Sequence, residues 1–426
     1  MRIRLDYHRQ GLEIEVPDSN LMAVLSMNRA EPLDDPIQEV LRTIRDPIGS
    51  PPLQKVAAGK RTACIVISDV TRPVPNRLLL PPILGVLEAS GIERDNIVIL
   101  VGTGLHRPNE GAELAEVAGR RIVGAYRFVN HVARDMAGQQ YLGQTPRGIP
   151  VHIDKTYMAA DLKIVTGLIE PHLMAGYSGG RKGVLPGIAG LDSIRAWHSP
   201  KILESPKATQ GIIEGNPVHE ESLAAAKMAG VDFIVNTVLN EKRQMLGVFS
   251  GNLEAAFAEG VKFCDRIVKA ELPQRADIVI TSSAGYPLDT TYYQACKGLV
   301  GALPAVKKGG TIIMAAGMAS GIGGPEFTRL VLETQSLEQF MQDIRRDDYF
   351  VIDQWQLEET GMVARHAEMW LYSDGLPKET QAKLFMKPLD SVEQGIEMAL
   401  AKHGPDAKIA VIPKGPYVIP FVKESP

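Results

Sequence analysis

Short runs of valine and isoleucine recur along this 426-residue chain, with helical stretches between them. Continuous apolar strands flanked by helices are typical of parallel sheets that are covered on both faces. In such sheets ligands bind beyond the carboxyl ends of the strands, so we expect the chemistry in the polar loops that follow these runs. The clearest runs are TACIVISD (62–69), NIVILVGTG (96–104), LKIVTG (162–167), ADIVITSS (276–283), GTIIMAAG (310–317) and AKIAVIP (407–413).

A change in pattern divides the chain into two parts. Residues 218–270 are helical and rich in alanine, with a short interruption near 231–240, and a proline among charged residues then precedes the next apolar run. We therefore predict an α/β fold with two Rossmann-like domains, mainly parallel sheets and an active-site cleft between the domains. The N-terminal domain is expected over residues 1–270 and the C-terminal domain over 271–426. The opening segment 2–17 predicts a hairpin packed on the first domain.

Composition and charge narrow the class of protein. Apolar residues make up 45% of the chain and charged residues 23%, which is typical of a globular protein. The net charge of −4 argues against a nucleic-acid binder, which usually carries a basic surplus. The three cysteines lie far apart in sequence and form no disulfide framework, which fits a reducing cytoplasm. The N-terminus has no apolar signal region, and no run approaches the roughly 18 apolar residues of a membrane span, so we expect a soluble cytoplasmic protein.

Polar side chains follow the first two apolar runs. Asp69 and Arg72 lie on a loop stiffened by two prolines, where an arginine can hold a carboxylate by two parallel hydrogen bonds and an aspartate can accept from a hydroxyl or fix the arginine. A local Asp–Arg ion pair in a turn is the alternative. His106 follows the next run, in GTGLHRP, where Arg107 replaces the third glycine of a dinucleotide fingerprint. A histidine there suits general acid–base work, although a lone loop histidine is more often a surface residue.

The densest concentration of candidate residues is IEPHLMAGYSGGRKGVLPGIAG, residues 169–190. Glycine is too frequent here for the interior of a helix or strand. The stretch Ser178-Gly179-Gly180 is able to present amide N–H groups to a phosphate, and Lys182 adds positive charge. No GK[ST] sequence closes the loop, so it is not a Walker A motif. A mobile linker is the alternative, but a linker would not normally carry histidine, tyrosine, arginine and lysine so close together.

A short helix is expected directly after the glycine-rich stretch. Asp192 is a plausible N-cap and Pro200 ends the segment, which places His198 in the last turn. His198 is a candidate metal ligand. The alternative is a packed histidine beside Trp197.

Candidate residues in the second domain follow the run at 276–283. Gln294 and Lys297 are three positions apart, so they share one face of a helix that Asp289 or Thr290 would cap. A lysine and an amide near a helix N-terminus suit a carboxylate, whereas the plainer alternative is an exposed surface lysine. Trp355 is expected at the end of a later strand, where it lines a pocket or fills the core.

Five motifs in this order and spacing resemble the nickel-pincer-dependent lactate racemase family over about residues 60 to 300. They are DVTRPVP (69–75), GTGLHRP (102–108), IEPHLMAGYSGGRKGVLPGIAG (169–190), AWHSP (196–200) and YYQACKG (292–298). The resemblance implies a racemase or epimerase of 2-hydroxy carboxylic acids, such as lactate or a related short acid, that works by reversible hydride transfer. It also implies a nickel-pincer nucleotide, a pyridinium-3,5-bisthiocarboxylic acid mononucleotide that holds nickel and is made by separate maturation proteins.

By position in the motifs, the resemblance assigns a role to each candidate residue. The cofactor would be attached covalently at Lys182, with His198 as the protein's nickel ligand. The two acid–base residues would be His106 and His172. The substrate would be bound by Asp69, Arg72, Tyr293 and Trp355, with Arg72 on its carboxylate, while Gln294 and Lys297 close over it. A phosphate cradle at Ser178, Gly179 and Gly180 is inferred from composition alone.

The implied chemistry accounts for these residue types. The α-hydrogen beside an ionised carboxylate is a very poor acid, so removal as hydride while a base takes the hydroxyl proton is preferable. Each enantiomer presents its hydroxyl to a different side, so one base is needed per side, and two histidines meet this need.

Two other interpretations stay open. A His-ligated metal hydrolase or lyase acting on a small carboxylate would use His106, His172 and His198 as ligands, but it leaves Lys182 without a role. A carboxylate-binding receptor would use Arg72 and Lys297 as clamps, but a periplasmic receptor needs a signal peptide, which is lacking here. The sequence does not decide which 2-hydroxy acid is bound or whether the chain forms a homodimer.

Overall fold

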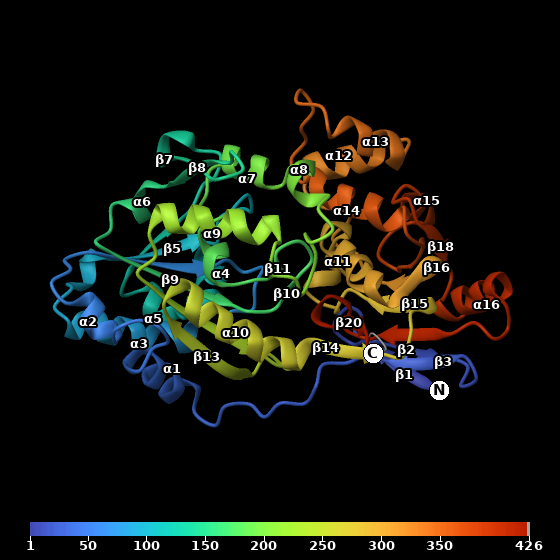
Figure 1. Ribbon diagram of the computed structural model, residues 1–426, viewed down its shortest axis with the longest axis horizontal. Helices are drawn as coiled ribbons and strands as arrows, with labels where there is room; N and C mark the ends of the chain where they lie inside the picture. Colours follow the sequence, from blue (N-terminus) through green and yellow to red (C-terminus); the bar gives the residue numbers. More distant parts are fainter. Residues whose placement is uncertain (424–426) are drawn as a thin grey trace. The chain divides into compact units, whose positions relative to one another are not determined.

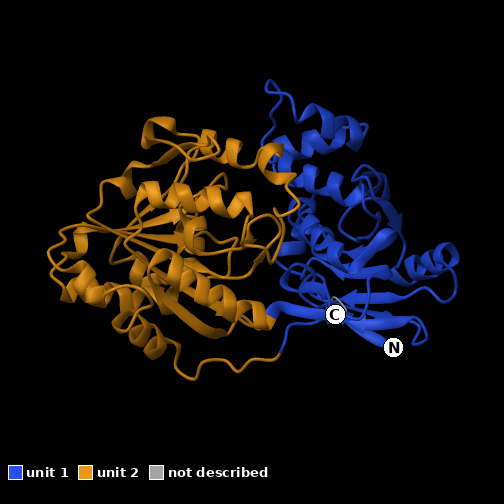
Figure 2. Cartoon of the chain, in the orientation of Figure 1, with its two compact units in different colours: residues 1–28, 268–426 blue, residues 29–267 orange. Residues whose placement is uncertain are grey.

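The computed structural model describes residues 1–423, which fall into two compact units (Figure 2). Unit 2 comprises Arg29–Ile267, and unit 1 combines Met1–Asn28 with the chain from Val268 onward. The change of unit near 268 lies close to the position expected from the sequence. The opening segment, however, was assigned to the wrong part, because it belongs to unit 1.

Unit 2 is built on a six-stranded sheet in the order β13-β12-β9-β4-β5-β6 (Figure 1). All neighbours in this sheet are parallel except β13, which runs antiparallel to β12. The three predicted apolar runs of this unit are confirmed as β4, β5 and β9. The interruption at 231–240 is β12, a fully buried central strand rather than a break between helices. The strands are β4 (Ala63–Ser68), β5 (Ile97–Gly102), β6 (Arg127–Asn130), β9 (Leu162–Leu168), β12 (Phe233–Leu239) and β13 (Met245–Gly251).

Helices cover one face of this sheet, and their apolar side chains form one core with it. The opposite face is covered as well, since Ile65 and Val66 of β4 point to opposite faces and are both almost fully buried. The core helices are α1 (Pro36–Arg45), α2 (Leu53–Ala57), α3 (Asn76–Ala89) and α4 (Gly111–Ala118), and the short α5 (Arg120–Val123) follows α4.

The glycine-rich stretch lies against β4 and β9. Its 3₁₀ turn η3 (Gly180–Gly183) contacts both strands, and a Cβ at Gly183 would lie only 2.4 Å from Val165 Cγ1. Glycine is therefore needed there because the backbone lies directly on the sheet. The other elements of unit 2 are β7 (Gln139–Gln144), β8 (Pro150–Asp154), α6 (Lys155–Met158), β10 (Pro171–His172), β11 (Gly176–Tyr177), α7 (Leu191–Trp197), α8 (Pro200–Leu203), α9 (Pro217–Ala229) and α10 (Leu253–Val268).

Unit 1 contains a second six-stranded sheet, in the order β18-β17-β16-β15-β19-β3, and all of its pairs are parallel. The three predicted runs of the C-terminal part are confirmed as β15, β16 and β19. The strands are β3 (Leu21–Val24), β15 (Ala276–Ser282), β16 (Val306–Ala315), β17 (Glu368–Tyr372), β18 (Lys387–Leu389) and β19 (Ile409–Ile412). The helices are α11 (Tyr292–Ala302), α12 (Pro325–Glu333), α13 (Leu337–Asp343), α14 (Gln354–Ala364), α15 (Lys378–Ala382) and α16 (Val392–His403).

The opening segment joins unit 1 for two physical reasons. Strand β3 extends the sheet by pairing with β19, and the predicted hairpin, β1 (Arg2–Leu5) with β2 (Leu12–Glu15), is amphipathic. Its inward residues Leu5 and Ile14 are almost fully buried in the same core as the strands of this sheet. A second pair, β14 (Lys269–Leu272) with β20 (Ile419–Val422), also belongs to this unit.

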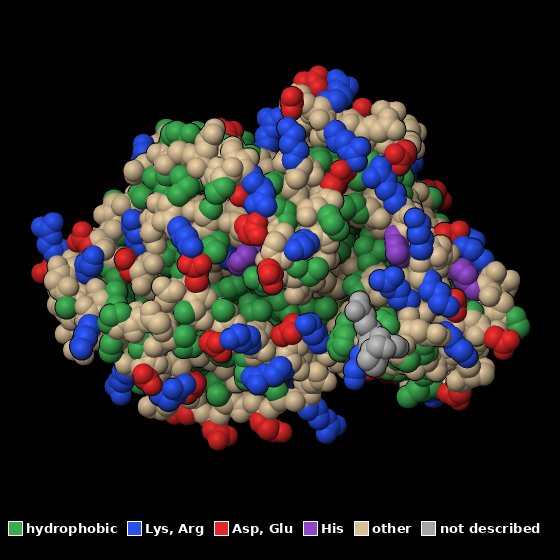
Figure 3. Space-filling model, viewed as in Figure 1, with side chains coloured by type: hydrophobic (Ala, Val, Ile, Leu, Met, Phe, Trp, Pro, Cys, Tyr) green, Lys and Arg blue, Asp and Glu red, His purple; other side chains and the backbone are tan. Residues whose placement is uncertain are grey.

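Two surface features bear on the expected class of protein. On the face drawn in Figure 3, basic and acidic side chains are intermixed over the described surface. None of the helices within residues 1–423 has the length and apolar composition required to cross a bilayer.

Candidate active site

Asp69 and His106 form a hydrogen-bonded pair at one edge of the unit 2 sheet. Their loops leave adjacent parallel strands, because β4 and β5 end with Ser68 opposite Gly102. His106 Nδ1 lies 2.7 Å from Asp69 Oδ2. An ionised carboxylate only accepts, so Nδ1 carries the hydrogen and the lone pair lies on Nε2. The geometry thus gives Asp69 a function that the sequence did not indicate, the orientation of His106.

Asp69 is held ionised in a buried position, with 3% of its surface exposed. Burial alone would raise the pKa of its carboxyl, but the hydrogen bond from His106 and a further bond from Thr71 lower the pKa below its ordinary value. Thr71 donates to Oδ1 from its hydroxyl at 2.6 Å and from its backbone N–H at 3.2 Å.

Asn109 links the loop that carries Asp69 to the loop that carries His106. Its Oδ1 accepts from the backbone N–H of Val70 at 2.9 Å, and its Nδ2 donates to Glu113 at 2.9 Å. Glu113 in turn binds both terminal nitrogens of Arg107, the neighbour of His106, at 2.7 Å. Asn109 is 1% exposed, so these bonds are shielded from water. Sequence reasoning missed this residue, although it directly follows the GTGLHRP motif.

Arg72 does not form the local ion pair with Asp69 that was the alternative interpretation of this loop. Its Nε lies 3.7 Å from Glu170 Oε1, and its Nη1 donates to the carbonyl and hydroxyl oxygens of Thr71 at 3.2 Å. The Arg72–Glu170 pair joins the loop after β4 to the segment that carries His172. The guanidinium is about three-quarters buried, so it is fixed close to both loops.

His172 lies in the small hairpin formed by β10 and β11, and backbone groups hold its ring. Its Nδ1 accepts from the backbone N–H groups of Met174 and Ala175, at 3.2 and 3.1 Å. Because both partners are donors, Nδ1 carries the lone pair and Nε2 carries the hydrogen. The ring is thus in the tautomer opposite to that of His106.

Two buried side chains hold this hairpin in place by hydrogen bonds to backbone carbonyls. Arg181, 1% exposed, donates to the carbonyls of Ala175 and Gly179 at 2.7 and 3.2 Å. Asn216, fully buried, donates to the carbonyl of Met174 at 2.8 Å. Burial lowers the pKa of Arg181 to about 9. Neither residue was singled out from the sequence, because the carbonyls that they bind are not visible in it.

Lys182 and His198 both contact the ring of Trp197. Lys182 Nζ is 4.6 Å from the ring centroid, and the His198 ring meets Trp197 edge-on at 4.5 Å between centroids. His198 is the C-cap of α7, as expected within one residue, but the N-cap is Gly190 and Asp192 lies in the first turn. The structure therefore places the predicted cofactor lysine and the predicted nickel ligand together.

The ring of His198 has the form that a metal ligand requires. Its Nδ1 is 2.9 Å from the carbonyl of Ile194, so Nδ1 carries the hydrogen and Nε2 the lone pair. Burial and the nearby Lys182 ammonium lower the pKa of His198 to about 3, so the ring is neutral at ordinary pH. A neutral imidazole held by a second hydrogen bond is the usual protein ligand for nickel or zinc.

The glycines of the predicted phosphate cradle have a packing role. The N–H of Ser178 donates to Glu170 O at 2.9 Å and that of Gly180 to Asn236 Oδ1 at 2.7 Å, so two amides of the stretch are already used within the chain. A Cβ at Gly179 would lie 2.5 Å from Asn236 Oδ1. Ser178 Oγ, in contrast, is buried and makes no hydrogen bond within residues 1–423. A polar ligand atom is the group that would satisfy this hydroxyl.

In unit 1, the expected pair on α11 is formed. Lys297 Nζ donates to Gln294 Oε1 at 2.5 Å. The helix is capped by Thr291, whose hydroxyl accepts from the N–H of Gln294 at 3.4 Å, and not by Asp289 or Thr290. Asp289 is buried and instead accepts from the backbone N–H of His8 at 2.7 Å.

Trp355 and Tyr293 also lie together in unit 1. Trp355 Nε1 donates to the Tyr293 hydroxyl at 3.2 Å. The predicted strand end at Trp355 was wrong. Trp355 lies in the first turn of α14, and that helix begins directly after Asp353, whose φ is 67°. Only 4% of Trp355 is exposed, so it is held rigidly against Tyr293.

The ligand set of the hydrolase interpretation is not formed. Over residues 1–423, no group of three or more histidine, cysteine, aspartate or glutamate side chains is arranged to hold a metal ion. The three histidines of that interpretation each use Nδ1 in a different local contact, as described above. The geometry thus favours separate roles for His106, His172 and His198.

Comparison with known proteins defines the class. The family model for the lactate racemase N-terminal domain matches residues 7–211, and that for the C-terminal domain matches residues 272–420. The chain is an isomerase of the racemase class. It belongs to the lactate racemase family.

Individual relatives agree over the whole length. The lactate racemase of Thermoanaerobacterium thermosaccharolyticum is 35% identical over 421 residues, 98% of each chain, and that of Lactiplantibacillus plantarum is 36% identical over 422 residues, 98% of this chain and 99% of the relative. The structure of the T. thermosaccharolyticum lactate racemase apoprotein matches all of both chains with a TM-score of 0.93 at 34% identity. A Thermotoga maritima structure with a TM-score of 0.71 and 16% identity, covering 93% of this chain and 100% of its own, shares the fold.

Proposed function

We propose that this enzyme racemises or epimerises lactate or a related short 2-hydroxy acid with a nickel-pincer nucleotide attached at Lys182. The observation that carries the proposal is the opposite hydrogen bonding of two histidines. His106 presents a lone pair on Nε2, and His172 presents a hydrogen on Nε2. His106 is therefore set to take the hydroxyl proton, whereas His172 donates a hydrogen bond from Nε2 to the substrate oxygen and gives up a proton only when its ring is an imidazolium.

The residues around Lys182 fit the proposed cofactor. Lys182 supplies an amine for covalent attachment, and His198 supplies a neutral imidazole whose lone pair lies on Nε2. The buried hydroxyl of Ser178 supplies a donor for a polar group of the nucleotide. When bound, the cofactor would supply a reversible hydride acceptor for C2 of the substrate. Its maturation proteins are partners under this proposal.

The protein's own residues handle the substrate's charge and its hydroxyl proton. Arg72 binds the carboxylate, since its guanidinium is fixed between the two histidine loops. One histidine takes the hydroxyl proton as the C2–H bond breaks, which leaves a 2-keto acid. The other histidine, as an imidazolium, returns a proton to the oxygen when the C2–H bond forms again on the opposite face, and proton exchange with water or turnover in the reverse direction restores both rings.

The residues of unit 1 complete the proposal. Lys297 stabilises the developing alkoxide, and Gln294 holds the lysine by their hydrogen bond. Tyr293 and Trp355 supply a rigid aromatic surface for the apolar part of a short hydroxy acid. Asp69 is proposed to orient His106 through their hydrogen bond and also to contact the substrate directly.

A chiral assay tests this function. Cofactor-loaded protein is incubated with single enantiomers of a panel of 2-hydroxy acids, and the products are separated on a chiral column. We expect interconversion of lactate or a close analogue, together with an intact mass above that of the polypeptide. The Lys182→Ala variant should lose both the interconversion of the acids and the added mass. The His198→Ala variant should retain the added mass but lose bound nickel. An active preparation with the mass of the bare polypeptide would exclude attachment at Lys182, and a loaded protein that interconverts none of the acids would exclude the proposed reaction.

A further inference from the structure

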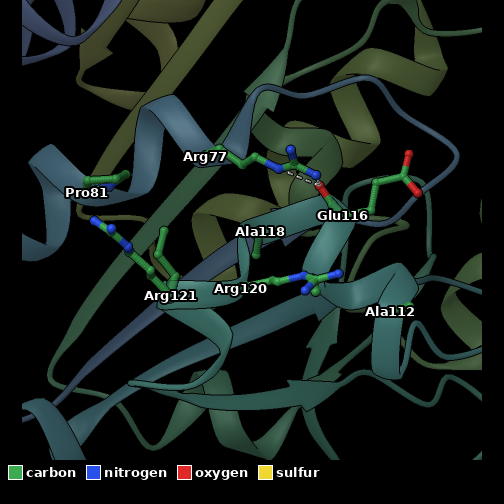
Figure 4. A pocket seen from close by; sticks show the side chains of 10 residues that line it. Arg77, Pro81, Ala112, Glu116, Ala118, Arg120 and Arg121 are labelled. Carbon is green, nitrogen blue, oxygen red and sulfur yellow. Dashed lines mark hydrogen bonds between the residues drawn. The ribbon is translucent and has the colours of Figure 1, made fainter.

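A hollow of about 610 Å³ lies on unit 2, among α3, α4 and α5 (Figure 4). None of the residues assigned to the reaction lines it. Its walls carry the side chains of Arg77, Arg120 and Arg121, and Figure 4 shows Arg120 and Arg121 extending from the short α5 on opposite sides. The only carboxylate among its lining residues is that of Glu116.

The arginines of this hollow differ from others in unit 2. Arg42, Arg94 and Arg107 each place a guanidinium nitrogen 2.7 Å from a glutamate oxygen. In contrast, over residues 1–423 no ion pair within 4.0 Å is formed by the three arginines of the hollow. Three like charges therefore share one concavity, and an anion bound there would relieve their repulsion.

One of these guanidiniums is already fixed in position. Arg77 donates from Nε and Nη2 to the backbone carbonyl of Glu116, at 2.9 and 2.6 Å. These bonds leave its other N–H groups for a ligand and reduce the side-chain entropy that binding would otherwise cost. Figure 4 shows the hydrogen bonds between Arg77 and Glu116 as dashed lines.

The lining also indicates the size and kind of ligand. Three guanidiniums against one carboxylate leave an excess of two positive charges. Pro81, Ala115 and Ile122 add apolar surface, and the volume lies within the range of small-molecule sites, roughly 300 to 1,000 Å³. Guanidinium groups bind phosphate by paired hydrogen bonds, and one phosphate supplies more charge than one carboxylate. We propose that this hollow binds a phosphorylated small molecule of nucleotide size with at least two negative charges.

Titration of the full-length protein tests the site. The probes are ATP, pyrophosphate, inorganic phosphate and uncharged adenosine, each followed by calorimetry at low and at physiological ionic strength. We expect ATP to bind more tightly than phosphate, adenosine not to bind, and binding to weaken with salt. If pyrophosphate binds as tightly as ATP, the phosphates alone account for the affinity. If ATP binds more tightly than pyrophosphate, the apolar lining also contributes to the affinity.

Variants locate the site. The double variant Arg120→Gln/Arg121→Gln should weaken ATP binding about 4- to 25-fold, since each exposed charge contact is worth roughly two- to fivefold. Arg61→Gln is the matched control, because Arg61 is also an exposed arginine of unit 2 but lies outside the hollow. It should leave binding unchanged. Thermal melting confirms that the variants are folded, and Arg121→Gln alone serves if the double variant is not.

Three results would overturn the proposal. They are no ATP binding at low ionic strength, equal ATP binding by wild type and the double variant, and equal weakening by Arg61→Gln. The second result would place the nucleotide elsewhere on the protein, and the third would indicate non-specific charge attraction. The site does not depend on the proposed reaction, and racemisation by the double variant should continue at the wild-type rate.

Discussion

The two histidine loops of unit 2 achieve opposite ring tautomers by different means. On the His106 loop, a buried carboxylate accepts from Nδ1, and Thr71 and Asn109 hold that arrangement in place. On the His172 hairpin, two backbone N–H groups donate to Nδ1. The first ring is fixed by a side chain and the second by the path of the main chain.

This difference determines what can disturb each ring. A carboxylate stabilises the imidazolium as well as the neutral ring, so His106 has support after it takes a proton. Backbone N–H groups oppose a hydrogen on Nδ1, so His172 is held as a donor at Nε2. A single substitution can remove the support of His106, whereas the support of His172 fails only when the hairpin itself moves.

Loss of either imidazole should have the largest effect. We expect His106→Ala and His172→Ala each to lower kcat by about 10²- to 10⁴-fold, the usual contribution of a general acid or base, with substrate affinity within about tenfold. Both directions of racemisation should fall equally, because the two enantiomers have equal free energies. Single-turnover experiments with one enantiomer at a time, followed by trapping of the 2-keto acid, should yield keto acid in His172→Ala, which keeps the ring with a lone pair on Nε2, and little in His106→Ala, whose remaining ring carries a hydrogen there. Equal yields of keto acid in both variants, or undiminished turnover, would refute the paired roles.

Removal of the carboxylate should affect one ring alone. Asp69→Asn retains the shape of the side chain but can donate to Nδ1 instead of accepting, so we expect kcat to fall roughly 10- to 100-fold. The ring ¹⁵N chemical shifts report the tautomer directly. His106 should change from the form with hydrogen on Nδ1 to a mixture, while His172 keeps its hydrogen on Nε2. A change at both rings would show that the two loops are coupled more tightly than their contacts indicate.

The same contrast explains what the sequence could and could not predict. Continuous apolar runs identified β4, β5 and β9, and the motifs at their ends held Asp69 and His106. The resemblance to a family supplied roles for Lys182 and His198, and the structure brings these two residues together. The tautomers could not be predicted, because they depend on which backbone groups approach each ring after folding.

Long-range pairing and local caps account for the remaining differences. Strand β3 pairs with β19, at the far end of the chain, and no local pattern in 1–28 indicates that partner. Several residues near 290 are suitable caps by type, and only the backbone geometry selects Thr291. Trp355 was assigned to the end of a strand, but α14 begins one residue earlier, at Gln354.

Two buried asparagines allow the loops to be compared for stability. Asn109→Ala should lower the free energy of unfolding by about 1–3 kcal/mol, since it leaves the N–H of Val70 without its acceptor. Asn216→Ala should cost more, about 2–4 kcal/mol, because Asn216 both binds the Met174 carbonyl and caps α9. Urea unfolding of both variants measures the difference. The Asn→Asp variants are matched controls that keep the accepting oxygen, so Asn109→Asp should retain the bond to Val70. A larger cost at Asn109 would contradict the assigned bracing.

The last expected effect is confined to acid pH, where His219 and Asp69 differ in how they change stability. Burial, followed by the charge of Arg181, lowers the pKa of His219 from 6.5 to about 3, so below pH 6.5 the unfolded chain takes up a proton that the folded chain does not. His219 therefore reduces stability progressively as the pH falls from 6.5 toward 3, by up to about 1.4 kcal/mol per pH unit. Asp69, whose pKa is lowered, contributes stability that is lost only below its ordinary value of 3.8.

The test is the slope of the unfolding free energy against pH in wild type and His219→Phe, measured in urea. The phenyl ring retains stacking on Phe257, whose ring centroid lies 6.0 Å from that of His219, but cannot titrate. We expect a shallower slope in the variant between pH 6.5 and 4, and equal slopes above 6.5, the ordinary pKa of histidine. Identical slopes over the acid range would mean that His219 takes up its proton without unfolding. In that case the buried charge of Arg181 beneath the His172 hairpin is screened more effectively than its surroundings indicate.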